Sequence, residues 1–158
     1  MALNKGTNSH ATVAEGDAYF ADRLDADEWT SATEEMKGQA LVTATSIFEY
    51  LNWAGVAVSE SQDLAFPRVG SYFDPRVGTE VEFGSTTPDR IIRATFELAF
   101  HFLSNDGILD DTGRAVDVVV GPIKLNQVFS PNLIPSHVKR LINPMLVNAG
   151  SNIWWRAN

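Results

Sequence analysis

A wide apolar stripe in residues 91–103 is the feature that most restricts how this chain folds. Side chains that favour burial recur there about every 3.6 residues, as they do along one face of a helix. They are Ile91, Ile92, Thr95, Leu98, Ala99, Phe102 and Leu103. Phe96 and Phe100 widen the stripe beyond the face that a surface helix buries. Because Thr87 and Pro88 precede the stripe as a cap and a first-turn proline, it predicts a helix at the centre of the core.

Two further helices are predicted before this one. Thr12 and Glu15 have the spacing of a capping box, in which each residue satisfies a backbone N–H of the other. That box predicts a helix over residues 13–24. A second helix, capped at residue 30 or 31, is expected to run to about residue 51 because its apolar side chains keep the helical period.

The sequence after residue 113 predicts a hairpin and a fourth helix. Residues 114–120 and 123–129 flank Gly121 and Pro122 and alternate in the manner of two short strands. A two-stranded hairpin is marginal alone in water, so we expect it to pack on the helices or to pair with another subunit. A helix is predicted from residue 135 or 136, with Pro144 kinking or loosening it.

These elements predict a mainly α fold. We expect a four-helix domain over residues 1–147 that carries the small β-hairpin at about residues 114–129. An extended C-terminal tail follows over residues 148–158. No internal repeat is found in the sequence.

The long connection over residues 52–86 is predicted to be an ordered loop with a contact role. Trp53 and Phe66 are large apolar anchors that each bury about 150–250 Å² when covered. Pro67 stiffens the chain beside Phe66, and Arg68 adds a planar set of donors. We expect Trp53, Phe66 and Arg68 to form contacts between subunits. Packing of the same loop on its own domain is the alternative.

Composition restricts the function further. The net charge of −8 argues against general nucleic-acid binding, which depends on Lys and Arg. Residues 112–158 carry one acid and five bases, which predicts contacts between copies of the chain; a solvated acidic surface is the alternative. The absence of cysteine excludes disulfides and fits a reducing compartment. No apolar run is long enough for a membrane span or a signal core, so we expect no membrane association.

No catalytic signature is found. His10, His101 and His137 do not have the spacing of a helical metal site, and there is no nucleophile elbow or phosphate-binding loop. Acidic groups near residues 22–28 and 106–111 are candidate cation sites, but solvated turns are the favoured interpretation. We therefore expect no enzyme activity, no catalytic residue, no metal and no cofactor.

The C-terminal tail is predicted to dock. It contains Ile153, Trp154, Trp155 and Arg156, and Trp and Arg are the residue types most enriched in binding hot spots. Residues 150–152 have the composition of a hinge. The alternative is that the tail folds back on its own domain.

An ordered set of short runs resembles a tailed-bacteriophage family that is labelled DnaT-like single-stranded DNA-binding protein. The runs are residues 11–20, Trp29, and residues 40–45, 52–55, 62–68, 87–91, 94–99 and 120–124. The chain is also similar in layout to the head–tail connector, or adaptor, proteins of phages. The resemblance covers about residues 9–146.

The connector resemblance implies a structural protein of the virion neck. Such proteins form a homo-oligomeric ring, commonly of twelve copies, beneath the portal protein. The ring extends the DNA channel and receives a tail, stopper or nozzle protein, so double-stranded DNA passes through without specific binding. On this reading the tail from Ile153 to Arg156 grips the portal, and the protein assembles in the host cytoplasm. The alternative function is a single-stranded DNA-binding replication accessory protein.

Overall fold

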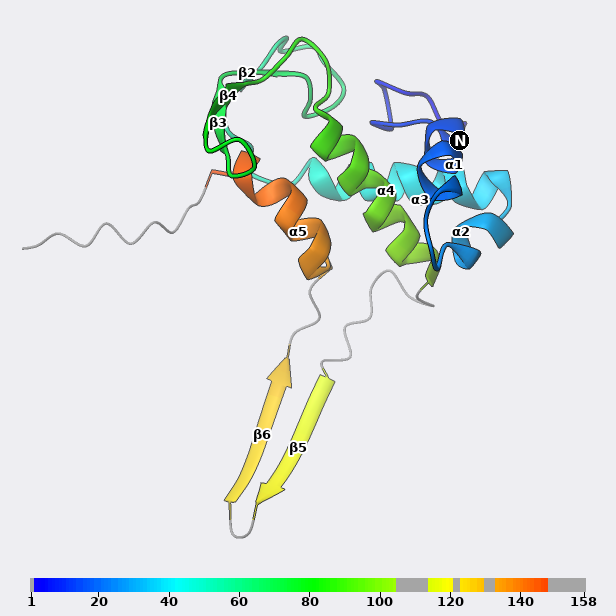
Figure 1. Ribbon diagram of the computed structural model, residues 1–158, viewed down its shortest axis with the longest axis vertical. Helices are drawn as coiled ribbons and strands as arrows, with labels where there is room; N and C mark the ends of the chain where they lie inside the picture. Colours follow the sequence, from blue (N-terminus) through cyan, green and yellow to red (C-terminus); the bar gives the residue numbers. More distant parts are fainter. Residues whose placement is uncertain (1, 105–113, 121–122, 130–132, 148–158) are drawn as a thin grey trace, which may run out of the picture.

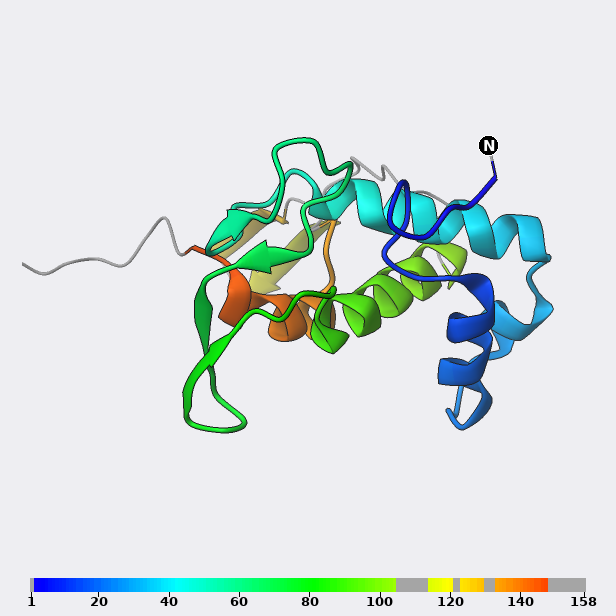
Figure 2. The same ribbon diagram turned by 90° about the horizontal axis from the view of Figure 1, so that it is seen from above.

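The centre of the computed structural model is α4 (Asp89–Ser104), which packs between α3 (Glu34–Phe48) and α5 (Ser136–Ile142) (Figure 1). The structure describes residues 2–104, 114–120, 123–129 and 133–147, and for the strands within 114–129 it describes the backbone only. Viewed from above, α3 and α4 lie side by side, with α1 (Val13–Ala21) and α2 (Asp27–Ser31) toward one end (Figure 2).

The predicted apolar stripe does form the core of α4. Ile91, Ala94, Leu98 and Ala99 are fully enclosed, and Phe96 is almost fully buried. They pack against buried side chains of α3 and α5, which include Leu41, Ala44, Phe48, Val138 and Ile142. A helix with buried residues around most of its circumference is expected at the centre of a helical domain.

Local sequence chemistry fixes the start of α1. The side chain of Thr12 accepts a hydrogen bond from the backbone N–H of Glu15, and the Glu15 carboxylate accepts one from the backbone N–H of Thr12. The predicted capping box is therefore confirmed. The helix ends at Ala21 rather than at the expected residue 24, and Leu24 is exposed.

The predicted fold class is wrong. The described residues form five α-helices, a short 3₁₀ helix η1 (Asn143–Met145) and three antiparallel strand pairs, so this is not a four-helix, mainly α domain with one hairpin. The expected cap at residue 30 or 31 lies inside α2. The cap of α3 is Thr33, whose hydroxyl oxygen accepts from the backbone N–H of Met36. A separate short helix therefore stands where one long helix was expected to begin.

The segment over residues 52–86 contains two of the strand pairs. β1 (Val56–Ala57) pairs with β2 (Arg68–Val69), and β3 (Ser71–Asp74) pairs with β4 (Thr79–Glu82). At the first pair, a Cβ on Gly55 would lie 2.2 Å from the carbonyl oxygen of Val69, and the φ of Gly55 is +71°. Only glycine accommodates both that backbone conformation and that close approach.

The third pair is the hairpin of β5 (Arg114–Val120) and β6 (Ile123–Phe129), whose bounds coincide with the ranges expected from the sequence. Figure 1 draws this hairpin apart from the helices. After α5 the chain passes through η1, where Pro144 lies, and an isolated bridge then pairs Leu146 with Trp53. Among the described residues, no helix has the length and apolar character needed to cross a membrane.

Candidate functional site

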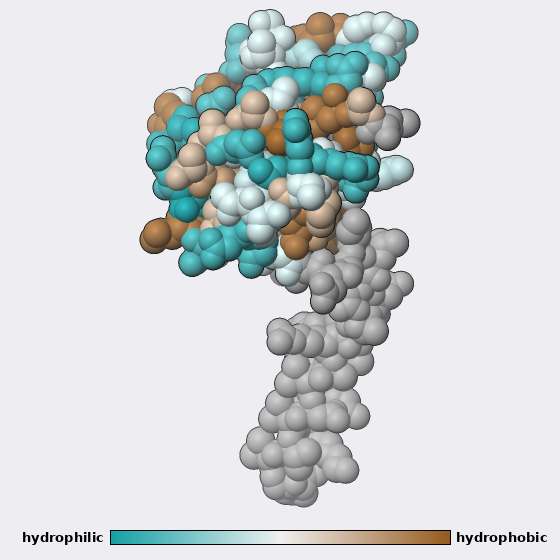
Figure 3. All heavy atoms as spheres, turned by 90° about the vertical axis from the view of Figure 1, so that its right-hand side faces the viewer, coloured by the Kyte–Doolittle hydropathy of each residue, from teal (hydrophilic) through white to brown (hydrophobic). Residues whose placement is uncertain are grey.

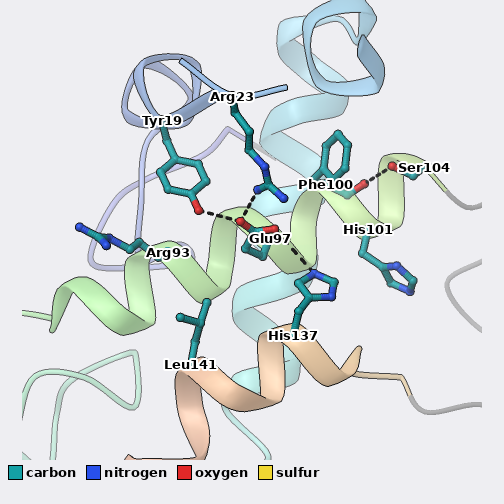
Figure 4. A pocket seen from close by; sticks show the side chains of 9 residues that line it. All are labelled: Tyr19, Arg23, Arg93, Glu97, Phe100, His101, Ser104, His137 and Leu141. Atoms are coloured by element: carbon teal, nitrogen blue, oxygen red, sulfur yellow. Dashed lines mark hydrogen bonds and ion pairs between the residues drawn. The ribbon is translucent and has the colours of Figure 1, made fainter. Parts of the chain in front are cut away.

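A pocket of about 500 Å³ lies where α1, α4 and α5 meet, and we call it the Glu97 pocket (Figure 4). Tyr19 of α1, Glu97 of α4 and His137 of α5 face one another across it. The rest of its lining is cationic, polar or apolar and consists of Arg23, Arg93, Phe100, His101, Ser104 and Leu141. The pocket thus combines charged and polar groups with the apolar surfaces of Phe100 and Leu141, and ligand sites use such polar groups to orient what they bind.

Glu97 connects the three helices around this pocket. Its Oε1 atom accepts hydrogen bonds from the Tyr19 hydroxyl at 2.6 Å and from the guanidinium of Arg23. Its Oε2 atom accepts no hydrogen bond from any described residue, and Nε2 of His137 lies 3.6 Å away. The side chain of Glu97 is only 8% exposed, whereas that of His137 is 54% exposed. One carboxylate oxygen is therefore saturated and the other has no donor among these residues.

The environment of this pocket perturbs two titrating groups. Burial, assisted by the hydrogen bond to Glu97, raises the pKa of Tyr19 to about 12. Burial also lowers the pKa of His101, and the neighbouring His137 lowers it further. Tyr19 therefore stays a hydrogen-bond donor over the whole physiological pH range.

A second pocket of about 270 Å³ adjoins the first, because Arg93 and Leu141 line both. We call it the Arg90 pocket, and the two together the α4–α5 groove. The other residues that line the Arg90 pocket come from the β3–β4 hairpin and the start of α4. They are Tyr72, Arg76, Pro88, Asp89 and Arg90. Arginine and aromatic side chains thus line both pockets of the groove.

Asp74 fixes the side chain of Arg90 at the second pocket and also accepts from the backbone of Arg76. This carboxylate is 2% exposed and accepts from the Arg90 guanidinium at 2.6 Å and from the backbone N–H of Arg76 at 2.9 Å. The backbone N–H of Arg76 and the charge of Arg90 lower the pKa of Asp74. Arg90 is therefore held in place by a charged hydrogen bond, which is stronger than a neutral one.

Arg93, at the junction of the two pockets, is held more loosely. Its side chain is 56% exposed, and its ion pair with Asp89 spans 3.8 Å. Asp89 is itself exposed, and ion pairs of this kind contribute at most about 1 kcal/mol. The Arg93 guanidinium can therefore exchange that partner for an anionic ligand at little cost.

Figure 3 shows hydrophilic and hydrophobic residues interspersed over one face of the helical body. Within the part of the chain that the structure describes, no group of three or more His, Asp or Glu side chains is arranged to hold a metal ion.

A comparison with protein-family models gives a match over residues 2–156. The matching family is described as "Putative DnaT-like ssDNA binding protein". The chain belongs to this family. Neither a curated protein nor a solved structure matches it.

For this DnaT-like family member, the match confirms one part of the resemblance seen in the sequence. It agrees with the DnaT-like label and gives no support to the head–tail connector label. A nucleic-acid role can be compared with the arrangement of side chains in the α4–α5 groove.

The structure places the expected subunit-contact residues inside the family member's own fold. Trp53 and Phe66 are buried and stack edge to face with ring centroids 4.9 Å apart. Arg68 donates to the backbone carbonyls of Ala54, Ala65, Trp53 and Gly55 at 2.7–3.4 Å. This geometry agrees with the alternative given by the sequence, in which the loop packs on its own domain. A role of the three residues between subunits stays a prediction.

Other expected and observed site residues do not coincide. Ile153, Trp154, Trp155 and Arg156 lie outside the described residues, so their docking role stays a prediction. The groove was not foreseen, because Tyr19, Glu97 and His137 are far apart in the chain and form no motif. The one signal in the sequence was Glu97 itself, a carboxylate placed between Phe96 and Leu98 in the helix predicted to lie at the centre of the core.

Proposed function

We propose that this protein binds single-stranded DNA and that the α4–α5 groove is the binding surface. One observation carries the proposal: arginines and partly exposed aromatic rings line two adjoining pockets joined at Arg93. The arginines are Arg23, Arg76, Arg90 and Arg93, and the rings are those of Tyr19, Tyr72 and Phe100. The family to which the chain belongs supports the same function.

This lining fits the way in which proteins bind single strands without preference for a base sequence. A cationic groove follows the phosphates, and aromatic or guanidinium planes stack on the bases. Arg23 already lies over the Phe100 ring, with its guanidinium carbon 5.7 Å from the ring centre. A base entering the Glu97 pocket would meet this stacked pair. Arg93 and Arg90 lie along the same groove, where the backbone of the strand would run.

The net charge of −8 limits how strong this binding is. The acidic remainder of the molecule repels a phosphate chain, so contact is confined to the groove. Few phosphates are then neutralised, and affinity falls as salt rises because each neutralised phosphate releases a counterion. The proposal is therefore one of modest, salt-sensitive binding to a short stretch of strand.

The test is fluorescence anisotropy with a labelled, mixed-sequence single strand. Wild-type protein is expected to bind at low salt, about 25 mM, and to lose affinity steadily as salt is added. Arg93→Gln is expected to weaken binding and to reduce the salt slope by about 0.7 for each phosphate that is no longer neutralised. Lys5→Gln is the matched control. It removes one positive charge that pairs with Glu15, away from the groove.

Two outcomes contradict the proposal. Absence of binding at low salt would exclude it. Equal reductions in affinity for Arg93→Gln and Lys5→Gln would show that binding depends on total charge, and the groove would then have no specific part.

A structural head–tail connector of a tailed phage is the second candidate. The net charge of −8 favours it, since a channel lined by carboxylates lets duplex DNA slide. In this proposal a homo-oligomeric ring of about twelve copies lies under the portal protein in the virion neck. It contacts a tail, stopper or nozzle protein, and the residues from Ile153 to Arg156 hold the portal.

Electron microscopy of virions and of purified portal mixed with this protein tests the second candidate. A ring of density between portal and tail supports it. The double variant Trp154→Ala, Trp155→Ala is expected to remove that ring while the far-ultraviolet circular dichroism stays unchanged. A ring retained at full occupancy in the double variant excludes the docking role, and a particle without the protein excludes the candidate.

A further inference from the structure

The Glu97 carboxylate presents a buried oxygen that accepts no hydrogen bond from the described residues and has only an ion-pair contact of 3.6 Å with His137. Oε1 is occupied by Tyr19 and Arg23, while Oε2 has no hydrogen-bond donor. The nearest candidate, Nε2 of His137, lies 3.6 Å away, beyond hydrogen-bond distance. Buried polar atoms in proteins are nearly always paired, so an exception calls for an explanation. A ligand that brings an N–H donor into the pocket would supply the missing partner.

One exposed side chain lies next to this buried atom. Oε2 is shielded from solvent, and His137 stands beside it on α5 (Figure 4). Because more than half of the His137 side chain is exposed, its ring can turn toward water without opening the core. The pocket of about 500 Å³ next to it then has room for a planar group stacked near Phe100.

The chemistry of the bases decides which planar group fits. Cytosine, adenine and guanine each carry an exocyclic amine, and a Glu carboxylate is a good acceptor for such an amine. Thymine and uracil carry carbonyl oxygens on both sides of their ring N–H. Placing those oxygens against a carboxylate sets like partial charges together, which disfavours binding.

We propose that the Glu97 pocket selects a base with an exocyclic amine and that Glu97 is the residue that determines this preference. The inference rests on the proposed function and deepens it, because it names the base class that one of the two pockets takes. The amine donates to Oε2, which is the one unsatisfied atom of the pocket carboxylate.

Cytosine and uracil oligonucleotides give the sharpest comparison. The two bases share ring size and lack the thymine methyl group, so they differ at the edge that Glu97 would read. With strands of about twelve nucleotides at low salt, wild-type protein is expected to bind the dC strand about tenfold more tightly than the dU strand. Anisotropy measured under identical conditions gives both affinities.

Two variants at and beside Glu97 test whether this carboxylate determines the base preference. In Glu97→Gln the side-chain amide both donates and accepts, so the ratio of the two affinities is expected to fall to about one. Tyr19→Phe is the comparison variant and is read by the ratio of the two affinities, not by overall affinity, because Tyr19 belongs to the proposed binding surface; it keeps the ring, removes a donor to Oε1 and leaves Oε2 in place. It is expected to keep the dC preference.

The outcomes separate this inference from the function on which it rests. Equal wild-type binding of both strands, with Arg93→Gln still weaker, overturns the base preference and leaves the function standing. A dC preference that survives in Glu97→Gln also overturns it. Binding of neither strand overturns both. If circular dichroism shows that Glu97→Gln is unfolded, His137→Ala decides instead: the more open pocket must keep or increase the dC preference.

Discussion

Gly16 of α1 and the indole ring of Trp29 are so close that a Cβ on Gly16 would lie 2.5 Å from Cζ2 of Trp29. Trp29 is fully buried, and its Nε1 donates to Oδ1 of Asp17 at 2.9 Å. The ring therefore has a fixed position and cannot move aside without losing that bond. The contact sets how closely α1 lies to α2, and α1 in turn supplies Tyr19 to the groove.

Gly16→Ala is therefore expected to destabilise the protein. The added methyl group overlaps a ring that cannot retreat, and overpacking of this kind costs about 1–3 kcal/mol. Gly38→Ala in α3 is the matched control: its Cβ would lie 3.8 Å from the nearest atom, and alanine favours helix by about 0.5–1 kcal/mol. Urea unfolding of both variants measures the two effects. Equal stabilisation by both would contradict the contact.

Arg68→Lys is expected to loosen the segment over residues 52–68. The guanidinium serves four backbone carbonyls, and a lysine ammonium cannot reach them together. The expected decrease in the free energy of unfolding is about 1–3 kcal/mol. Arg76→Lys, at an exposed arginine with a 3.8 Å ion pair, is expected to change stability by at most about 0.5 kcal/mol.

The same pair of variants separates the two roles considered for Arg68. Chemical denaturation reports the internal role, and sedimentation reports the association state. A variant that keeps its stability but changes its association would show that Arg68 acts between subunits rather than within the loop.

His10 is expected to make stability depend on pH. Its side chain is enclosed, with Nε2 3.6 Å from Oε1 of Glu49, and burial lowers the pKa of His10 to about 4. The unfolded chain protonates His10 near its ordinary pKa of about 6.5. Between these values the unfolded state binds more protons, so stability falls as pH drops, by up to about 3 kcal/mol.

The measurement is the free energy of unfolding from pH 7 down to about pH 4, compared with His10→Gln. Burial raises the pKa of Glu49, which acts in the opposite sense, and the variant retains that residue. The difference between the two curves therefore reports the histidine together with its contact to Glu49. Parallel curves would mean that His10 is protonated as easily in the folded protein as in the unfolded chain.

Tyr19 is expected to ionise only in strong base. The chain has three tyrosines, and burial beside Glu97 raises the pKa of Tyr19 to about 12. Ultraviolet titration of tyrosinate should therefore contain one late step near that pH. Tyr19→Phe should lose the late step, and Tyr50→Phe, at an exposed tyrosine, should keep it. A late step that persists in Tyr19→Phe would contradict the assignment.

The sequence predicted those parts of the fold that are set by local pattern. The stripe of α4 and the capping box at Thr12 depend on neighbours within a few residues, and both are present. The division between α2 and α3 was missed because several residues in that region were equally good caps. β1 and β2 are two residues each, too short for alternation to be visible, and they form because distant backbone groups meet.

The groove was beyond sequence reasoning for a related reason. Glu97 meets Tyr19 across 78 positions, and Asp74 meets Arg90 across 16, so no motif spacing records either contact. Trp53 and Phe66 were identified as anchors, but their residue types do not tell whether the partner is the same chain or another. The structure answers this for the fold, where they stack on each other.

Glu97 has one further consequence for experiment. The Glu97 carboxylate contacts side chains from α1 and α5 at the wall of a pocket. A ligand in that pocket should therefore change the stability of the helical body. Its arrival should be visible as a shift in melting temperature, even when its identity is unknown. A thermal-shift screen of nucleosides and short strands would thus give a ligand search that presupposes no activity.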